Sequence, residues 1–546
     1  MSLTHLRRPV LGQLAFIMLF ALYIALALNL HFYRQAFALL PVNSLHTALV
    51  FATLPLVAFC VINIVLTLAS FLWLERPVIT LMILASAAAQ FFMIAYGVVI
   101  DRSMIDNIVD TTPAETLALL SPRLIATLLL SGLLPAMLAW WLRIRGPRLN
   151  LRSVLWRAGS IVVSGLLIVL VALLFYKDYA SLFRNNKELV KSLNPSNSIV
   201  AVNSWYVHNR LNNLPLVRIG LDAAQRPQMK AGPRHNLTIV VLGETSRAEN
   251  FSLGGYGRDT NPRLAKDDVV YFPKTTSCGT STAVSVPCMF SNMPREHYNA
   301  GLAHHQEGVL DVIQRAGIQV LWNENDGGCK GACDRVPHQD MTQLDLPGQC
   351  IDGECDDAVL FHGLEAYIDG LKGDGIIVLH TIGSHGPTYY RRYPANLRTF
   401  TPTCDSNEIQ TCSRQALVNT YDNTIVNVDY IVDRAIKLLE AKQDRFTTSL
   451  VYLSDHGESL GENGVYLHGL PWSIAPEQQT HVPLLIWLSE DYRNRYGIDY
   501  RCLKAQAQNN AVSQDNLFST LLGLTGVSTR EYHQQDDILT SCRRGE

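Results

Sequence analysis

The chain has 546 residues, a formal net charge of −2 and only 17% charged residues. Because nucleic-acid-binding proteins carry a basic face, we expect this near-neutral chain to have no nucleic acid partner. Its 48% of hydrophobic residues, together with so few charges, is typical of a protein partly embedded in a membrane.

The N-terminal third contains five apolar runs, each long enough to cross a bilayer, which requires about 20 residues. They cover residues 11–30, 48–72, 78–100, 124–142 and 154–176. The first run is too long for the apolar core of a cleaved signal peptide, and four more follow, so we expect it to be a span. The sequence therefore predicts a transmembrane domain of five helices over residues 1–176.

Basic residues lie mainly on one side of these spans. They are Arg7, Arg8, Arg76, Arg143, Arg145, Arg148 and Arg152. Cytoplasmic loops carry the excess of Lys and Arg, which places the N-terminus in the cytoplasm. With five spans, everything after residue 176 is then expected on the other side of the membrane.

Cysteine usage supports this topology. Of the 11 cysteines only Cys60 falls in the membrane region. The others form the close couples Cys278/Cys288, Cys329/Cys333, Cys350/Cys355 and Cys404/Cys412 and the more distant couple Cys502/Cys542. An even number of cysteines outside the cytoplasm is typical of disulfides. Reduced or metal-bound thiols are the alternative, but the paired C-x2-C pattern of a structural zinc site is missing. We expect neighbours to pair, although sequence alone does not determine connectivity.

Residues 177–230 form a linker of different composition. Apolar, aromatic and basic residues recur at roughly helical spacing over 177–193, the stretch Asn-Pro-Ser-Asn at 194–197 breaks the pattern, and Trp205 and Tyr206 follow in a second segment. Such amphipathic helices next to a span suit the membrane interface. An ordinary solvated linker helix is the alternative.

From about residue 236 onward, apolar strands alternate with helical patterns. Strands are expected at 237–242, 318–322, 375–380, 449–453 and 482–487, and helices at 308–316, 365–371 and 419–439. This alternation indicates a mainly parallel sheet that is covered on both faces. We predict one large α/β domain over residues 231–546.

Acidic and imidazole side chains follow three of these strands. Glu244 comes after the first strand, Asp455 and His456 come after the fourth, and His380 and His385 follow or end the third. The carboxyl ends of parallel strands meet at one edge of a sheet, where ligands bind. Zinc accepts carboxylate oxygen and imidazole nitrogen, so we predict a zinc site at this edge.

The segment 278–288 reads Cys-Gly-Thr-Ser-Thr-Ala-Val-Ser-Val-Pro-Cys and is expected to be a loop that opens a helix. A helix N-terminus stabilises anions, and a hydroxyl that ligates zinc becomes a nucleophile near neutral pH. Thr282 is one candidate nucleophile. From the residues alone Thr280, Ser281 and Ser285 remain alternatives, and any of them can simply cap the helix.

Four segments resemble the phosphoethanolamine transferases that modify lipid A in Gram-negative bacteria. They are Gly-Glu-Thr-Ser-Arg at 243–247, Ser-Cys-Gly-Thr-Ser-Thr-Ala at 277–283, His-Thr-Ile-Gly-Ser-His-Gly-Pro at 380–387 and Ser-Asp-His-Gly-Glu-Ser-Leu-Gly-Glu-Asn at 454–463. The likeness extends through the spans and the cysteine couples. It implies a multi-pass protein of the bacterial inner membrane, with an alkaline-phosphatase-like α/β/α domain in the periplasm.

The resemblance also implies roles for individual residues. Zinc is expected to be held by Glu244, Thr282, Asp455 and His456, with Thr282 as the nucleophile. The residues implied in holding the phosphoethanolamine group are Lys330, His385, His468 and Thr280. His385 and His468 are in addition a candidate site for a second zinc, because two imidazoles suit this metal.

The family further implies that Asn107, Thr111 and Glu115, in the loop after the third span, bind substrate. Their spacing of four predicts that they share one face of a helix. The sequence Thr-Pro-Ala-Glu at 112–115 is at the same time a capping box with proline at the first helical position. A purely structural role for Glu115 is therefore the alternative.

The implied reaction moves phosphoethanolamine from phosphatidylethanolamine to a lipid A phosphate through an intermediate on Thr282, releasing diacylglycerol. The expected partners are these two lipids and the surrounding membrane, and the expected state is a monomer. The modified lipid A is expected to bind polymyxin less well.

Other functions compete with this interpretation. They are transfer to another lipopolysaccharide or glycan acceptor, a phosphoglycerol transferase, a sulfatase, and a membrane sensor with a periplasmic binding module. A sulfatase is disfavoured because its nucleophile is a Cys or Ser that is converted to an aldehyde, which Thr282 cannot supply.

Overall fold

The computed structural model describes residues 8–40, 42–145, 150–210, 215–230, 232–344, 346–351 and 354–544. The chain divides into two compact units. The first comprises Met1–Ile105 and Leu120–Trp205, and the second comprises Asp106–Leu119 and Tyr206–Glu546. The short segment Asp106–Leu119, which lies between two spans in the sequence, thus belongs to the second unit.

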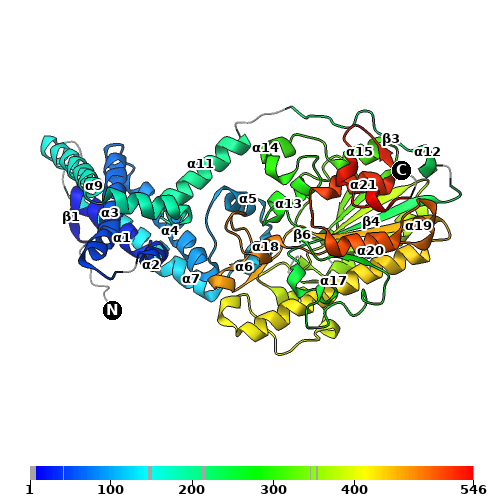
Figure 1. Ribbon diagram of the computed structural model, residues 1–546. Coiled ribbons are helices and arrows are strands. Elements are labelled where there is room, and N and C mark those ends of the chain that lie inside the picture. Colours follow the sequence, from blue (N-terminus) through cyan, green and yellow to red (C-terminus); the bar gives the residue numbers. More distant parts are fainter. Residues whose placement is uncertain are drawn as a thin grey trace. The chain divides into compact units, whose positions relative to one another are not determined.

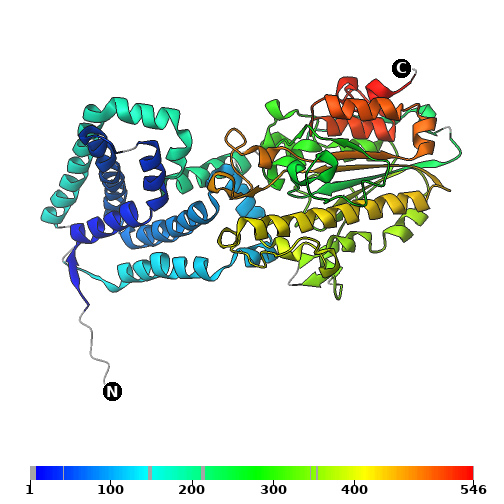
Figure 2. The ribbon, with the colours of Figure 1, turned by 60° about the horizontal axis from the view of Figure 1, so that its bottom comes forward.

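The first unit is helical, and its long helices are shown in blue and cyan in Figures 1 and 2. Four stretches are long and apolar enough to cross a membrane. They are α3 (Leu45–Phe71), α4 (Glu75–Tyr96), the run of α7 (Pro122–Thr127), η1 (Leu128–Leu133) and α8 (Leu134–Trp141), and the first 29 residues of α9 (Leu151–Asn185). The pair α1 (Gln13–Ala27) and α2 (Leu30–Leu39) makes a fifth span if its two parts are counted together. The number of spans then equals the predicted five.

The first span differs from the prediction because it bends by 52° and continues to Leu39. Asn29 lies at the bend and is buried. Its amide donates to the carbonyls of Ile24 and Asn194, and its side-chain oxygen accepts from the N–H of Asn194. Because the polar groups at the bend satisfy one another, the chain can change direction here without leaving this amide unpaired.

The linker begins inside α9, which continues past residue 176. The helical backbone is interrupted at Phe175, with φ −123° and ψ 22°, one residue before the predicted end of the transmembrane domain. Two helices follow, α10 (Lys187–Lys191) and α11 (Ser196–Arg210), separated by the predicted break around Asn194. Placement of these helices in the membrane interface stays a prediction.

The second unit is built on a sheet of seven strands in the order β5-β15-β12-β4-β11-β7-β8. Their bounds are Val270–Phe272 (β5), Leu484–Leu488 (β15), Phe446–Ser454 (β12), His235–Gly243 (β4), Gly375–His380 (β11), Gln319–Glu324 (β7) and His338–Asp340 (β8). β12, β4, β11, β7 and β8 pair in parallel, whereas β15 pairs antiparallel to both β12 and β5. The predicted mainly parallel sheet is confirmed, and the short edge strands β5 and β8 are additions to it.

Helices cover both faces of this sheet. In Figures 1 and 2 the long helix α17 (Arg414–Ala441), in yellow, lies on one side, and α20 (Tyr500–Asn509) and α21 (Asn516–Thr525), in orange and red, lie on the other. The apolar strand residues are almost completely buried between these layers. Each buried Val, Leu or Ile contributes about 1.5–3 kcal/mol, so the strand ends rest on a stable frame.

The predicted disulfides are confirmed with the expected neighbour pairing. Bonds join Cys278–Cys288, Cys329–Cys333, Cys350–Cys355, Cys404–Cys412 and Cys502–Cys542. Cys60 is a buried free thiol. The bonds lie in the second unit, which agrees with an oxidising environment for that part of the chain.

Candidate active site

The polar residues predicted to meet at one edge of the sheet do so. Gly243, at the end of β4, pairs with Ser454 at the end of β12, and His380, at the end of β11, pairs with Leu242. Glu244 and Asp455 therefore leave adjacent strands at the same level. The backbone N–H of Asp455 donates to the Gly243 carbonyl, which extends the strand pairing into the site.

Glu244, Asp455 and His456 form a cluster that is completely buried. The Nε2 atom of His456 lies 3.3 Å from Glu244 Oε1 and 3.3 Å from Asp455 Oδ2. The hydroxyl of Thr282 donates to Glu244 Oε2 at 3.1 Å and lies 3.4 Å from His456 Nε2. Glu244 and His456 thus face the Thr282 oxygen directly, and Asp455 faces His456.

The ring orientation of His456 is set by the backbone. Its Nδ1 atom lies 2.8 Å from the Gly457 carbonyl, an acceptor only, so Nδ1 donates and Nε2 faces the cluster. Burial lowers the pKa of His456, but the charges of Asp455 and Glu244 outweigh burial and raise it to about 10. The cluster therefore attracts a positive charge strongly, whether as a proton or as a metal ion.

The spacing of these atoms fits a zinc ion. Four ligands at about 2.0–2.1 Å from a tetrahedral zinc ion lie about 3.3 Å from one another. The four separations given above, which involve both oxygens of Glu244, are 3.1–3.4 Å and agree with this value. Asp455 Oδ2 is in addition a buried oxygen with no hydrogen-bond partner among the described residues. The donor set and its geometry both suit Zn²⁺.

Thr282 is the first residue of α13 (Thr282–Met289), as expected for a loop that opens a helix. The alternative hydroxyls point elsewhere. Thr280 donates to the Leu470 carbonyl at 2.6 Å, and Ser285 accepts from the N–H of Gly279 at 3.0 Å. Ser281 is the N-cap residue, and its side chain caps nothing. Of these four hydroxyls, the one of Thr282 makes the contacts with Glu244 and His456.

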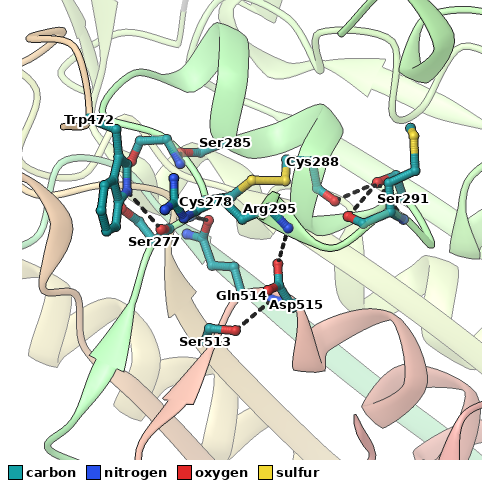
Figure 3. The surroundings of a disulfide bond; sticks show 12 residues. Ser277, Cys278, Ser285, Cys288, Ser291, Arg295, Trp472, Ser513, Gln514 and Asp515 are labelled. Atoms are coloured by element: carbon teal, nitrogen blue, oxygen red, sulfur yellow. Dashed lines mark hydrogen bonds between the residues drawn. A yellow bond between two sulfur atoms is a disulfide. The ribbon is translucent and has the colours of Figure 1, made fainter. Parts of the chain in front are cut away.

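Gln514 is a positioning residue that sequence reasoning missed. Figure 3 shows it beside the Cys278–Cys288 disulfide. Its side-chain oxygen accepts from the N–H of Cys278 at 2.6 Å, and its amide nitrogen donates to the carbonyls of Ser454 and Asp455 at 2.8 Å and 2.5 Å. Gln514 thereby joins the loop of Thr282 to the end of β12. No local sequence signal marks it, because its partners are distant backbone groups.

His385 and His468 lie beside the cluster. The ring centre of His468 is 4.4 Å from that of His456 and 5.4 Å from that of His385. The Nδ1 atom of His468 lies 3.3 Å from Glu458 Oε1, and burial lowers the pKa of His385 to about 3. The turn before His385 requires glycine at 383, where φ is +49° and an added Cβ would lie 2.6 Å from the Glu244 carbonyl oxygen.

A cavity of about 870 Å³ contains Lys330 and Glu115 among its lining residues. The Nζ atom of Lys330 donates to the Gly327 carbonyl at 3.3 Å. Burial raises the pKa of the Glu115 carboxyl, and the charge of Lys330 opposes this. The cavity thus offers one lysine, two histidines and several acidic side chains, which suits a zwitterionic group.

The expectation that Asn107, Thr111 and Glu115 share one helical face is wrong. α5 (Arg102–Asp110) ends before Thr111, and α6 (Pro113–Leu119) starts a second helix. The Thr111 hydroxyl donates to the Asn107 carbonyl at 2.6 Å. The Thr112 hydroxyl accepts from the N–H of Glu115 and thereby caps the helix, and it donates to the Glu115 carboxylate, which also lines the cavity. Proline at 113 favours a new helix start, which breaks the spacing of four.

Known proteins resemble this chain over almost its whole length. A family model described as Sulfatase matches residues 236–527, and a model described as Phosphoethanolamine transferase EptA/EptB matches residues 58–210. The chain is 69% identical over 539 residues to phosphoethanolamine transferase EptA of Escherichia coli K12, with 99% of this chain and 98% of that protein covered. The chain belongs to the EptA family of phosphoethanolamine transferases.

More distant members of this family share most of the chain. Phosphatidylethanolamine transferase Mcr-1 of Escherichia coli is 36% identical over 490 residues, covering 87% of this chain and 88% of the relative. The solved structure of the integral membrane lipooligosaccharide phosphoethanolamine transferase A from Neisseria meningitidis superposes with a TM-score of 0.95 at 42% identity, covering 98% of this chain and all of that one. The chain is thus an integral protein of the bacterial inner membrane, with an alkaline-phosphatase-like domain in the periplasm.

Proposed function

We propose that this transferase moves phosphoethanolamine from phosphatidylethanolamine to a phosphate of lipid A, using Thr282 as nucleophile. The observation that carries the proposal is the Thr282 hydroxyl, 3.1 Å from Glu244 Oε2 and 3.4 Å from His456 Nε2 in a buried cluster. Glu244, Thr282, Asp455 and His456 would hold Zn²⁺. A zinc ion bound there would lower the pKa of the Thr282 hydroxyl and attract phosphoryl oxygens.

The reaction takes place in two displacements. The Thr282 hydroxyl loses its proton to solvent and its oxygen forms a bond to the phosphorus of phosphatidylethanolamine. The bond from phosphorus to the glycerol oxygen breaks, and this oxygen takes up a proton as diacylglycerol leaves. His468 faces the cluster and is partly exposed, which places it to protonate that oxygen. An oxygen of a lipid A phosphate then attacks the same phosphorus and the bond from phosphorus to the Thr282 oxygen breaks. His468 and the Thr282 oxygen regain their protons from the incoming phosphate and from solvent.

The cavity supplies the contacts to the transferred group. The ammonium of Lys330 offsets charge on the phosphoryl oxygens, and the carboxylate of Glu115 suits the ethanolamine ammonium. We assign further contacts with phosphoethanolamine to Thr280, His385 and His468, and to Asn107 and Thr111 in the segment Asp106–Leu119. His385 and His468 also form the candidate site of a second zinc in turnover.

The division of the chain suits two lipid substrates. We propose that residues 1–176 anchor the enzyme, that 177–230 lie along the membrane surface, and that 231–546 carry out catalysis as a monomer. The ammonium of phosphoethanolamine would leave the modified lipid A with less negative charge, so cationic polymyxin would bind less well.

The test is intact mass spectrometry of the full-length protein after incubation with phosphatidylethanolamine alone. We expect one phosphoethanolamine adduct, which peptide mapping places on Thr282. Lipid A spectra from cells with and without the protein then identify the acceptor. An adduct without any change in lipid A would mean that the acceptor is another lipopolysaccharide or glycan group. The absence of any adduct, with Thr282→Ala fully active, would reject the mechanism.

A further inference from the structure

A second group of potential ligands lies next to the first. Glu244, Asp326 and His380 are all buried, and one ligand atom from each lies within 4.8 Å of the others. The three come from neighbouring strands, because Glu244 follows β4, His380 ends β11 and Asp326 follows β7. None of the steps proposed for Thr282 uses Asp326 or His380.

The ring of His380 is held in the manner of a metal ligand. Its Nδ1 atom lies 2.8 Å from Glu324 Oε2, and the same carboxylate accepts from the indole N–H of Trp322 and the backbone N–H of Asp326. Because this carboxylate acts as the acceptor, Nδ1 carries the proton and Nε2 presents its lone pair. A histidine that ligates a metal commonly donates its other N–H to a carboxylate in this way.

The Nε2 atom of His380 has no hydrogen-bond partner in the described part of the chain, although the residue is 0% exposed. It lies 3.8 Å from Asp326 Oδ2, too far for a hydrogen bond. An imidazole lone pair and two carboxylates thus face one another in a buried space. Such an arrangement of acceptors is costly unless a cation lies between them.

We propose that Glu244, Asp326 and His380 bind a further Zn²⁺ ion, separate from the ions assigned to the Thr282 cluster and to His385 and His468. One imidazole and two carboxylates form a ligand set that Zn²⁺ accepts, and ligand distances of about 2.0–2.2 Å span the 3.8 Å gap. Glu244 would then be shared by two metal ions. The ion would offset the charge of Asp326 and hold the Glu244 carboxylate in place for Thr282.

The first test measures the number of zinc ions bound per chain of the full-length protein in detergent. The protein is dialysed against buffered zinc, and its metal content is then determined by elemental mass spectrometry. We expect Asp326→Asn and His380→Gln each to lose one zinc per chain relative to wild type. Asp334→Asn is the matched control, because Asp334 lines the same cavity outside this cluster, and its zinc content should equal that of wild type. Unchanged zinc content in both Asp326→Asn and His380→Gln would overturn the proposal.

A measurement on the wild-type protein removes any dependence on how the variants fold. Anomalous scattering at the zinc absorption edge, from crystals of the full-length protein grown with zinc, should show a peak between Glu244, Asp326 and His380. A fully occupied peak at Thr282 with none at this position would reject the additional site and leave the proposed function intact. The adduct on Thr282 tests that function separately.

Discussion

Asn29 in the first unit and Glu244 in the second are both buried polar residues near the end of a regular element, yet their surroundings are of opposite kinds. The Asn29 amide and oxygen meet backbone acceptors and a donor, so every partner is supplied by the chain. Around Glu244, the atoms that face one another are mostly acceptors, including Asp455 Oδ2 and His380 Nε2.

The difference separates a structural polar group from a functional one. A buried group whose hydrogen bonds are complete stabilises a bend or a turn and requires no ligand. Buried acceptors that lack donors are stabilised by a cation or a proton, and they are therefore candidate places for a cation to bind. Four predictions sharpen this contrast, from the largest expected effect to the smallest.

Substitution of Thr282 by alanine should abolish transfer, with kcat reduced by at least about 10³-fold, because the nucleophile is lost. Transfer of a labelled headgroup to lipid A measures the effect. The matched control is Ser281→Ala, one residue away, whose hydroxyl caps nothing and which should keep most of the activity. Equal losses in the two variants would show that the loop, rather than the Thr282 oxygen, is required.

Exhaustive removal of metal should reduce transfer to background, while the second unit stays folded because five disulfides and the buried sheet hold it. Circular dichroism and the activity assay, run on the same sample, measure the two properties. Addition of Zn²⁺ should restore activity. Transfer that persists in metal-free protein would disprove a catalytic role for zinc.

Substitution of Gln514 by leucine should lower kcat by about 10- to 100-fold, with a smaller effect on KM, because the loop of Thr282 is no longer joined to Ser454 and Asp455. Gln514→Glu keeps the acceptor for the Cys278 N–H and loses the two donors. Its kcat should therefore lie between those of wild type and Gln514→Leu. A change in KM alone would place Gln514 in substrate binding instead.

Substitution of Asn29 by alanine should cost about 1–3 kcal/mol of stability, since the N–H of Asn194 loses its acceptor in a buried position. Thermal unfolding in detergent measures the loss. The zinc content of the variant should stay the same as that of wild type. A drop in bound zinc would contradict the assignment of Asn29 to a purely structural role.

Much of the site was predictable because its chemistry lies close to strand ends. Glu244, Asp455 and His456 follow apolar runs directly, and parallel strands bring their carboxyl ends together. The shared helical face of Asn107, Thr111 and Glu115 was predicted wrongly, whereas the alternative of a helix that starts at the proline at 113 is confirmed. Gln514 was missed because its partners are backbone atoms more than 50 residues away.

The sequence by itself determined the five apolar runs, the cysteine couples and the strand ends that carry acidic and imidazole groups, since these depend on composition and local order. The disulfide pairing of neighbours was an expectation that the tertiary structure confirmed. The residues alone left Thr280, Ser281 and Ser285 open beside Thr282, and only the family resemblance singled out Thr282. The tertiary structure adds that the Thr282 hydroxyl faces Glu244, a residue distant in the sequence, whereas the Thr280 hydroxyl donates to a backbone carbonyl. The cluster of Glu244, Asp326 and His380 also exists only in three dimensions. It forms where three neighbouring strands end, and no stretch of sequence contains it.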